Sequence, residues 1–139
     1  MKKAIEAHPE AEAVVFLGDG ERDFDNCRDC LQGKRIYTVA GNNDFYSKAP
    51  KRLVICENEV SIYLTHGHYE YVKSSKQGLL TAAKNAGCSI ALYGHTHIQA
   101  VDYAEGIHLF CPGALMNGEY GMVDITDKGI ICLPVKNNR

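Results

Sequence analysis

Four strand-like segments of the chain each end in a short turn that holds a glycine and at least one side chain able to bind a metal ion. These side chains are Asp19, Asn42, His66, His95 and His97. In α/β proteins, binding sites collect beyond the carboxyl ends of strands. Carboxylate, amide and imidazole groups are ligands of divalent metals. The pattern therefore predicts an α/β fold in which these side chains meet at one rim of a sheet.

Each of these residues also has an ordinary interpretation. Aspartate and asparagine are common turn formers, so Asp19 in Gly-Asp-Gly and Asn42 could be turn residues only. The three histidines could be exposed loop side chains. All of these interpretations together require four coincidences along one chain. A metal site is therefore the favoured hypothesis.

Composition limits the class of protein. The chain has 139 residues, of which 45% are hydrophobic and 23% are charged. This is the size and composition of one globular domain, which we expect to span residues 1–139. The net charge of −2 gives no signal for nucleic-acid binding. No apolar run approaches the roughly 18 residues that a membrane span needs, so no membrane association is expected.

The N-terminus shares with signal peptides only its two lysines, Lys2 and Lys3. Glu6, Pro9 and Glu10 interrupt the apolar stretch that a signal peptide requires. We therefore expect a cytoplasmic protein whose cysteines stay reduced.

Local signals predict the secondary structure around the four turns. Strands that lead into the turns are expected at residues 13–17, 35–40, 59–65 and 89–93. Helices are expected over residues 21–32 and from 74 or 75 to 85. Hairpins are expected to turn at residues 57–58, 105–106 and 127–129.

The motifs LGDG, AGNND, LTHGH and YGHTH, in this order, resemble the calcineurin-like metallophosphoesterase superfamily. The resemblance is to its small single-domain bacterial and archaeal phosphodiesterase branch. HLFCPGALM resembles a later Asn-Pro-Gly-Ser element, with Cys111 and Ala114 replacing its first and last residues. The resemblance implies an αββα sandwich of two mixed sheets with helices outside. It also implies metal-dependent hydrolysis of a small phosphoester, most naturally a diester.

The resemblance also implies roles for the candidate residues. Asp19 would bridge two divalent metals, and Asn42, His66 and His95 would complete the ligands of one of them. His97 would bind the other metal. All five residues would then be both metal-binding and catalytic, with a bridging hydroxide as the nucleophile. The expected ion is Mn²⁺, with Zn²⁺, Fe²⁺ or Ni²⁺ as alternatives.

Of the two residues after Asn42, Asn43 departs from the family motif and Asp44 matches it. Much of the superfamily has a histidine next, which assists the leaving group, whereas this chain has Asn43. Proton assistance would then come from water or from His68, which favours substrates with good leaving groups. Asp44 matches an acidic position of the family motif and is expected to orient a ligand.

A larger departure lies at the N-terminus, where the family has a strand that ends in Asp-x-His. The sequence given has neither, so we expect the first strand to be missing, the second metal to be poorly held and activity to be weak. The alternative is a non-catalytic scaffold on the same fold, as in the phosphoesterase-like subunit of the retromer coat. An unpaired edge at residues 13–17 should be covered by residues 1–8 or by a second copy of the chain, which gives a homo-oligomer.

Overall fold

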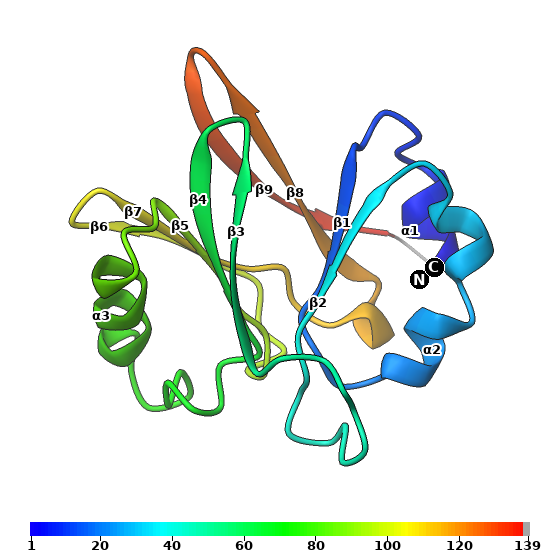
Figure 1. The fold of residues 1–139 in the computed structure, drawn as a ribbon, viewed down its shortest axis with the longest axis horizontal. Coiled ribbons are helices and arrows are strands. Elements are labelled where there is room, and N and C mark those ends of the chain that lie inside the picture. The colour runs from blue at the N-terminus through cyan, green and yellow to red at the C-terminus, as the bar shows by residue number, and fades with distance from the viewer. Residues whose placement is uncertain (138–139) are drawn as a thin grey trace.

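The computed structural model describes residues 1–137, and its centre is a five-stranded mixed sheet (Figure 1). The strand order is β3-β4-β5-β7-β6. The strands are β3 (Arg52–Glu57), β4 (Val60–Thr65), β5 (Ile90–Leu92), β6 (Ala100–Ala104) and β7 (Ile107–Cys111). The three central strands run parallel, and the edge strands β3 and β6 are antiparallel to their neighbours. All of β5 is buried, as expected for a central parallel strand.

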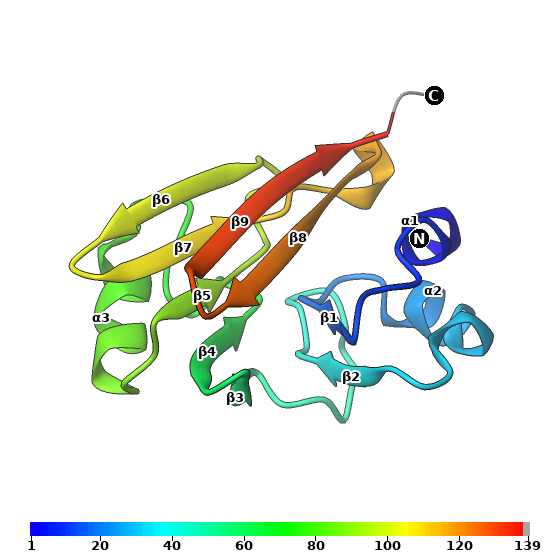
Figure 2. The same ribbon diagram turned by 90° about the horizontal axis from the view of Figure 1, so that it is seen from above.

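Two small sheets pack against one face of this central sheet. One pairs β1 (Ala13–Phe16) in parallel with β2 (Arg35–Thr38), and the other is the hairpin of β8 (Glu119–Thr126) and β9 (Gly129–Lys136). Their inward side chains join a core cluster with Leu64, Leu92 and Phe110 of the central sheet. The view from above shows the two small sheets as separate pieces of this layer (Figure 2). The predicted sandwich is therefore present, with its second layer in two pieces.

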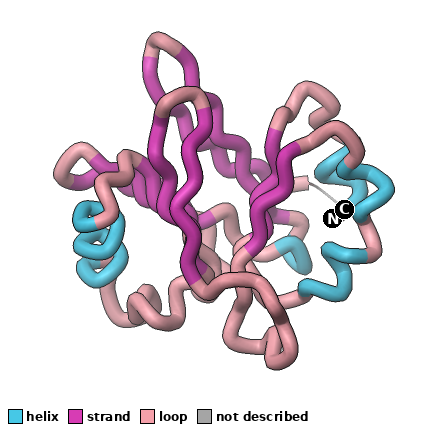
Figure 3. Tube along the Cα trace, in the orientation of Figure 1, coloured by secondary structure: helices cyan, strands magenta, loops and turns pink. Residues whose placement is uncertain are grey.

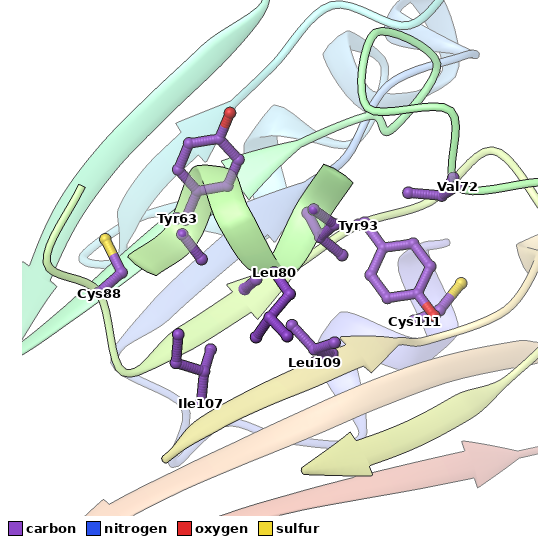
Figure 4. Packing of buried hydrophobic residues seen from close by; sticks show 11 residues of the cluster. Tyr63, Val72, Leu80, Cys88, Tyr93, Ile107, Leu109 and Cys111 are labelled. Carbon is purple, nitrogen blue, oxygen red and sulfur yellow. The ribbon is translucent and has the colours of Figure 1, made fainter. Parts of the chain in front are cut away.

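The helix α3 (Gln77–Asn85) covers the other face of the central sheet. Leu79, Leu80 and Ala83 of α3 belong to a second core cluster, which includes Tyr93. Figure 4 shows Leu80 and Tyr93 in this cluster. Both helix and sheet bury apolar side chains here, which leaves the rim of the sheet free for polar groups.

Three local predictions needed correction. The helix expected from residue 74 or 75 begins at Gln77 instead, with no side-chain cap. The expected helix over residues 21–32 is instead α2 (Glu21–Asp25) followed by a 3₁₀ turn, η1 (Arg28–Leu31). Asp25 and Asn26 favour helices weakly, and Asp25 instead pairs with Arg28 across the break at 3.0 Å. The first hairpin turns one residue later than expected, because Asn58 and Glu59 adopt the positive φ angles of a tight two-residue turn.

The N-terminal segment does not pair with β1 as a strand. Residues Lys2–Glu6 form α1, which contacts η1, and His8 lies 2.8 Å from the hydroxyl of Tyr120 on β8. Of the two coverings expected for the edge of β1, residues 1–8 therefore supply no strand pairing, and a second copy of the chain stays a prediction. A second 3₁₀ turn, η2 (Leu115–Asn117), precedes β8. None of the helices within residues 1–137 is long and apolar enough to cross a membrane.

The loops that follow β1, β2, β4 and β5 gather at the lower edge in the tube view (Figure 3).

Candidate metal centre

His66 lies at the centre of this rim and is only 2% exposed. It follows β4 directly, and its Nδ1 lies 2.7 Å from the carbonyl oxygen of Leu17, at the end of β1. A carbonyl oxygen can only accept, so Nδ1 carries the proton and donates it. In the neutral ring, Nε2 is then a bare lone pair.

Three further polar atoms surround His66 Nε2. Asn42 Oδ1 lies at 2.9 Å, Asp19 Oδ2 at 3.2 Å and His95 Nδ1 at 3.2 Å. A carboxylate has no proton, and an amide oxygen cannot donate. The lone pairs of His66 Nε2 and of two side-chain oxygens therefore point at one small region, and His95 Nδ1 adds a fourth when its ring carries the proton on Nε2. Such a set is favourable only with a cation or an added proton among its members.

These separations match the spacing of neighbouring ligands around one ion. Donors bound at about 2.0–2.2 Å, with angles of about 90–110° between them, lie roughly 2.8–3.6 Å apart. Within residues 1–137, no group of three or more His, Cys, Asp or Glu side chains is arranged to hold a metal ion by itself. The candidate set around His66 also includes the Asn42 amide oxygen, and oxygen and nitrogen atoms together are ligands that divalent ions take.

The Asp19 carboxylate is held in place by the neighbouring loop. The backbone N–H of Asn43 donates to Asp19 Oδ1 at 2.8 Å, and the Asn43 side-chain amide donates to Oδ2 at 3.1 Å. Asp19 itself has φ of +62°, a conformation that non-glycine residues seldom adopt. The loop therefore fixes the direction of this carboxylate at some cost in backbone strain.

Asp44 organises the backbone beneath Asp19. Its carboxylate accepts hydrogen bonds from the N–H groups of Asp19, Gly20, Glu21 and Gly41, at 2.7–3.3 Å. Burial alone would raise the pKa of Asp44, but the four donors outweigh it and the net shift is downward. The structure thus places Asp44 as the residue that orients the ligand loop.

Two glycines let the loops after β1 and β2 touch. A Cβ on Gly18 would lie 2.5 Å from the backbone nitrogen of Gly41, and a Cβ on Gly41 would overlap the Asp19 carboxylate. No side chain fits at either position. The glycines in LGDG and AGNND therefore allow Asp19 and Asn42 to approach each other.

His95 and His97 follow β5 and differ in placement. Both have positive φ, +69° and +61°. Burial, and then the nearby His66, lower the pKa of His95, which favours the neutral ring that binds metals. His97 is exposed and lines a cavity of about 610 Å³ beside the rim, together with Met116 and Glu119. Among residues 1–137, no hydrogen bond or ring contact connects His97 to the other four candidates.

His68 also belongs to the rim. Its ring lies 5.4 Å from that of His66 and 5.9 Å from that of His95, and its Nδ1 is buried without a hydrogen-bond partner. Burial, and then the proximity of His66, lower the pKa of His68. His68 Nδ1 is therefore a further polar atom at this rim that a bound ligand or water could pair with.

Two of these contacts have no direct signal in the sequence. A backbone carbonyl such as that of Leu17 has no side-chain signature, so its role emerges only from the packing of β1 against β4. Asn43 stands where much of the superfamily has a histidine, and its hydrogen bonds to Asp19 depend on the fold of the loop.

Comparison with known proteins places this geometry in context. The profile of the calcineurin-like phosphoesterase superfamily domain matches residues 1–128. The protein named probable metallophosphoesterase YsnB from Bacillus subtilis (strain 168) is 24% identical over 113 residues, which make up 81% of this chain and 66% of that protein. The chain spans between 58% and 66% of the length of the curated relatives it matches.

Solved structures share the fold. The crystal structure of a predicted phosphoesterase from Streptococcus pneumoniae TIGR4 aligns with a TM-score of 0.76 at 29% identity, covering 91% of this chain and 75% of that one. Wild-type Vps29 from Entamoeba histolytica, complexed with Zn²⁺, aligns with a TM-score of 0.64 at 17% identity, covering 89% of this chain and 81% of that one. At that identity, the Vps29 likeness concerns the fold alone.

Proposed function

The chain belongs to the calcineurin-like phosphoesterase superfamily, and from this premise we propose that it is a metal-dependent phosphodiesterase. One observation carries the proposal: Asp19, Asn42 and His95 converge on the bare Nε2 of His66 within 3.2 Å. Such a cluster of oxygen and nitrogen atoms suits a divalent cation. Phosphoester hydrolysis is a reaction that a cation at a protein rim can promote.

The proposed roles follow from the contacts of each residue. Asp19, Asn42, His66 and His95 would hold the ion, and Asn43 and Asp44 would fix the direction of Asp19. A bound ion supplies a more acidic water and offsets the charge on the phosphoryl oxygens. His68, with its unpaired nitrogen beside the cluster, is placed to bind the substrate or a water.

One cavity adjoins the proposed centre. It has a volume of about 360 Å³ and is lined by Asn42 and His68. The cavity of about 610 Å³ is lined by His97 and by none of the four residues around His66. The smaller cavity can take one organic arm of a phosphoester, and a diester is proposed because the sequence motifs resemble those of phosphodiesterases.

The absence of a proton donor at Asn43 sets the expected substrate preference. An amide cannot protonate a departing alkoxide near neutral pH. We therefore propose that rates rise steeply as the leaving group becomes more acidic. Aryl esters such as bis(p-nitrophenyl) phosphate would be cleaved well before alkyl esters.

The metal is proposed to be Mn²⁺, with Zn²⁺ as the first alternative, because Vps29 from Entamoeba histolytica has been crystallised with Zn²⁺. His97 and Asp19 are this chain's own candidates for a second ion. Since two side chains hold a second ion poorly, we propose low turnover for residues 1–139 alone. Cytoplasmic location and a small phosphoester substrate remain part of the proposal.

A non-catalytic scaffold is the second candidate, and the Vps29 likeness of fold favours it. The retained cluster around His66 argues for chemistry instead. The experiment is to load the chain with Mn²⁺ or Zn²⁺, measure bound metal by elemental analysis, and follow bis(p-nitrophenyl) phosphate hydrolysis with and without EDTA. Metal binding without chelator-sensitive hydrolysis would favour the scaffold. Hydrolysis that is lost in His95→Ala together with the metal would support the enzyme.

A further inference from the structure

The cavity of about 360 Å³ beside the proposed metal centre is lined by both polar and aromatic side chains. Asn42 and His68 form the side next to the metal cluster, and Phe45 and Tyr69 form part of the remainder. The cavity falls at the lower end of the size range of small-molecule sites, about 300–1,000 Å³. It is large enough for one planar ring system but not for a large ligand.

Phe45 is 82% exposed although its side chain is wholly apolar. It lies in the loop between β2 and β3, three residues after Asn42. Among residues 1–137, no aromatic or cationic side chain contacts its ring. An apolar ring kept in water beside a polar centre has an unfilled contact face, and a planar ligand would cover it.

Tyr69 is held in a fixed place on the same cavity. Its ring centroid lies 4.2 Å from that of His68, and Lys51 Nζ lies 5.0 Å from it. The ammonium group of Lys51 is thereby kept at the cavity by a cation–π contact. The Lys51 ammonium group would attract an anionic phosphodiester bound at the metal, and Lys51 lines the same cavity as Phe45 and Tyr69.

We propose that this cavity binds a planar aromatic arm of the phosphodiester, an aryl ring or a nucleobase, against Phe45 and Tyr69, with Lys51 beside the phosphate. The inference rests on the proposed function and adds the substrate class. Aromatic stacking tolerates different ring systems because each has a π-face. The two sources of the ring are therefore separated by experiment.

The test is calorimetric titration of the Zn²⁺-loaded full chain with three diesters that share a phosphate and differ in one arm. Dimethyl phosphate has no ring, methyl phenyl phosphate has an aryl ring, and thymidine 5′-methyl phosphate has a nucleobase. We expect at least one ring-bearing ligand to bind about tenfold more tightly than dimethyl phosphate, within the range of single stacking contacts. The tighter of the two identifies the source of the ring.

A matched pair of variants isolates the cavity. Phe45→Ala should remove the gain from the ring and leave dimethyl phosphate unchanged. Tyr46→Ala should change neither, because Tyr46 is the adjacent aromatic, is 99% exposed and does not line the cavity. Equal affinities for all three ligands, or equal effects of the two variants, would overturn the inference.

A second measurement does not depend on turnover. The chain contains no tryptophan, so Phe45→Trp places a single tryptophan in the cavity, and its emission can be excited selectively over that of the eight tyrosines. Ring-bearing diesters should shift its emission, dimethyl phosphate should not, and Tyr46→Trp should respond to neither. Binding of all three diesters without a ring effect contradicts the inference and leaves the proposed function standing. Failure of all three to bind the metal-loaded chain contradicts both.

Discussion

The Leu17 carbonyl oxygen accepts a hydrogen bond from His66 Nδ1 at 2.7 Å. This contact joins the end of β1 to the end of β4, across two sheets that share no backbone pairing. It fixes the tautomer of His66 and aims Nε2 at Asn42 and Asp19. A backbone atom thus determines which nitrogen is available to a metal, as outer hydrogen bonds do in many metal sites.

His66→Ala is expected to lower the affinity for metal by about a hundredfold or more. The reason is that the three other proposed ligands, Asp19, Asn42 and His95, all lie within 3.2 Å of His66 Nε2. Elemental analysis after gel filtration and calorimetric titration with Zn²⁺ measure the effect. His108→Ala is the control, because His108 lies on β7 against Tyr103, away from the rim. Full metal content in His66→Ala would refute the assignment of the centre.

Asn43→Ala tests whether the second asparagine positions Asp19. The substitution removes the side-chain hydrogen bond to Asp19 Oδ2 and keeps the backbone bond to Oδ1. Loss of one such supporting contact should weaken metal binding about tenfold. Asn43→Asp, which places a like charge beside Asp19, should not rescue it. Unchanged affinity in Asn43→Ala would mean that the loop backbone alone positions Asp19.

Asp44 should make the metal-free protein sensitive to acid. Its pKa lies below the ordinary value, so its contribution to stability is fully present above about pH 4 and is lost as the pH falls through the lowered pKa. Asp44→Asn should destabilise the fold by about 1.5–3 kcal/mol at neutral pH, because charge-assisted hydrogen bonds to four N–H groups are weakened. Urea unfolding at several pH values in EDTA measures both effects. A parallel pH dependence in wild type and variant would exclude this role.

The sequence predicted where the candidate residues meet better than it predicted their supporting contacts. Asp19, Asn42, His66 and His95 lie together at one rim, as the four strand ends indicated, because parallel strands deliver their carboxyl ends to the same side. The break in the helix at Asn26 and the separation of the second layer into two sheets were not predicted. Both depend on packing between distant segments, which local periodicity does not encode.

Glu70 supports the loop that carries His66 and His68. Its buried carboxylate accepts hydrogen bonds from Tyr63 and Thr65 at 2.8 Å each and from Arg52 at 3.1 Å. Glu70→Ala leaves the buried hydroxyl groups of Tyr63 and Thr65 without this acceptor and should cost about 3 kcal/mol of unfolding free energy. Glu70→Gln keeps part of the network and should cost less. Thermal and urea unfolding of both variants measure the difference, and equal stability of Glu70→Ala and wild type would contradict it.

One edge of β1 has no strand partner within residues 1–137, because β1 pairs with β2 alone. Arg35 donates to the Glu12 carbonyl and Val39 to the Phe16 carbonyl, so the alternating ladder points the N–H and C=O groups of Val15 away from β2.

Among residues 1–137, no backbone group pairs with that edge, and such an edge is a template for another strand. The chain is therefore expected to self-associate across it. Val15→Pro removes the outward N–H without touching the β1–β2 ladder, so it should shift the protein toward monomer in light scattering. Val14→Pro is the control: it removes an N–H that faces β2 and should lower the melting temperature instead. A wild-type chain that is monomeric at high concentration would refute the pairing.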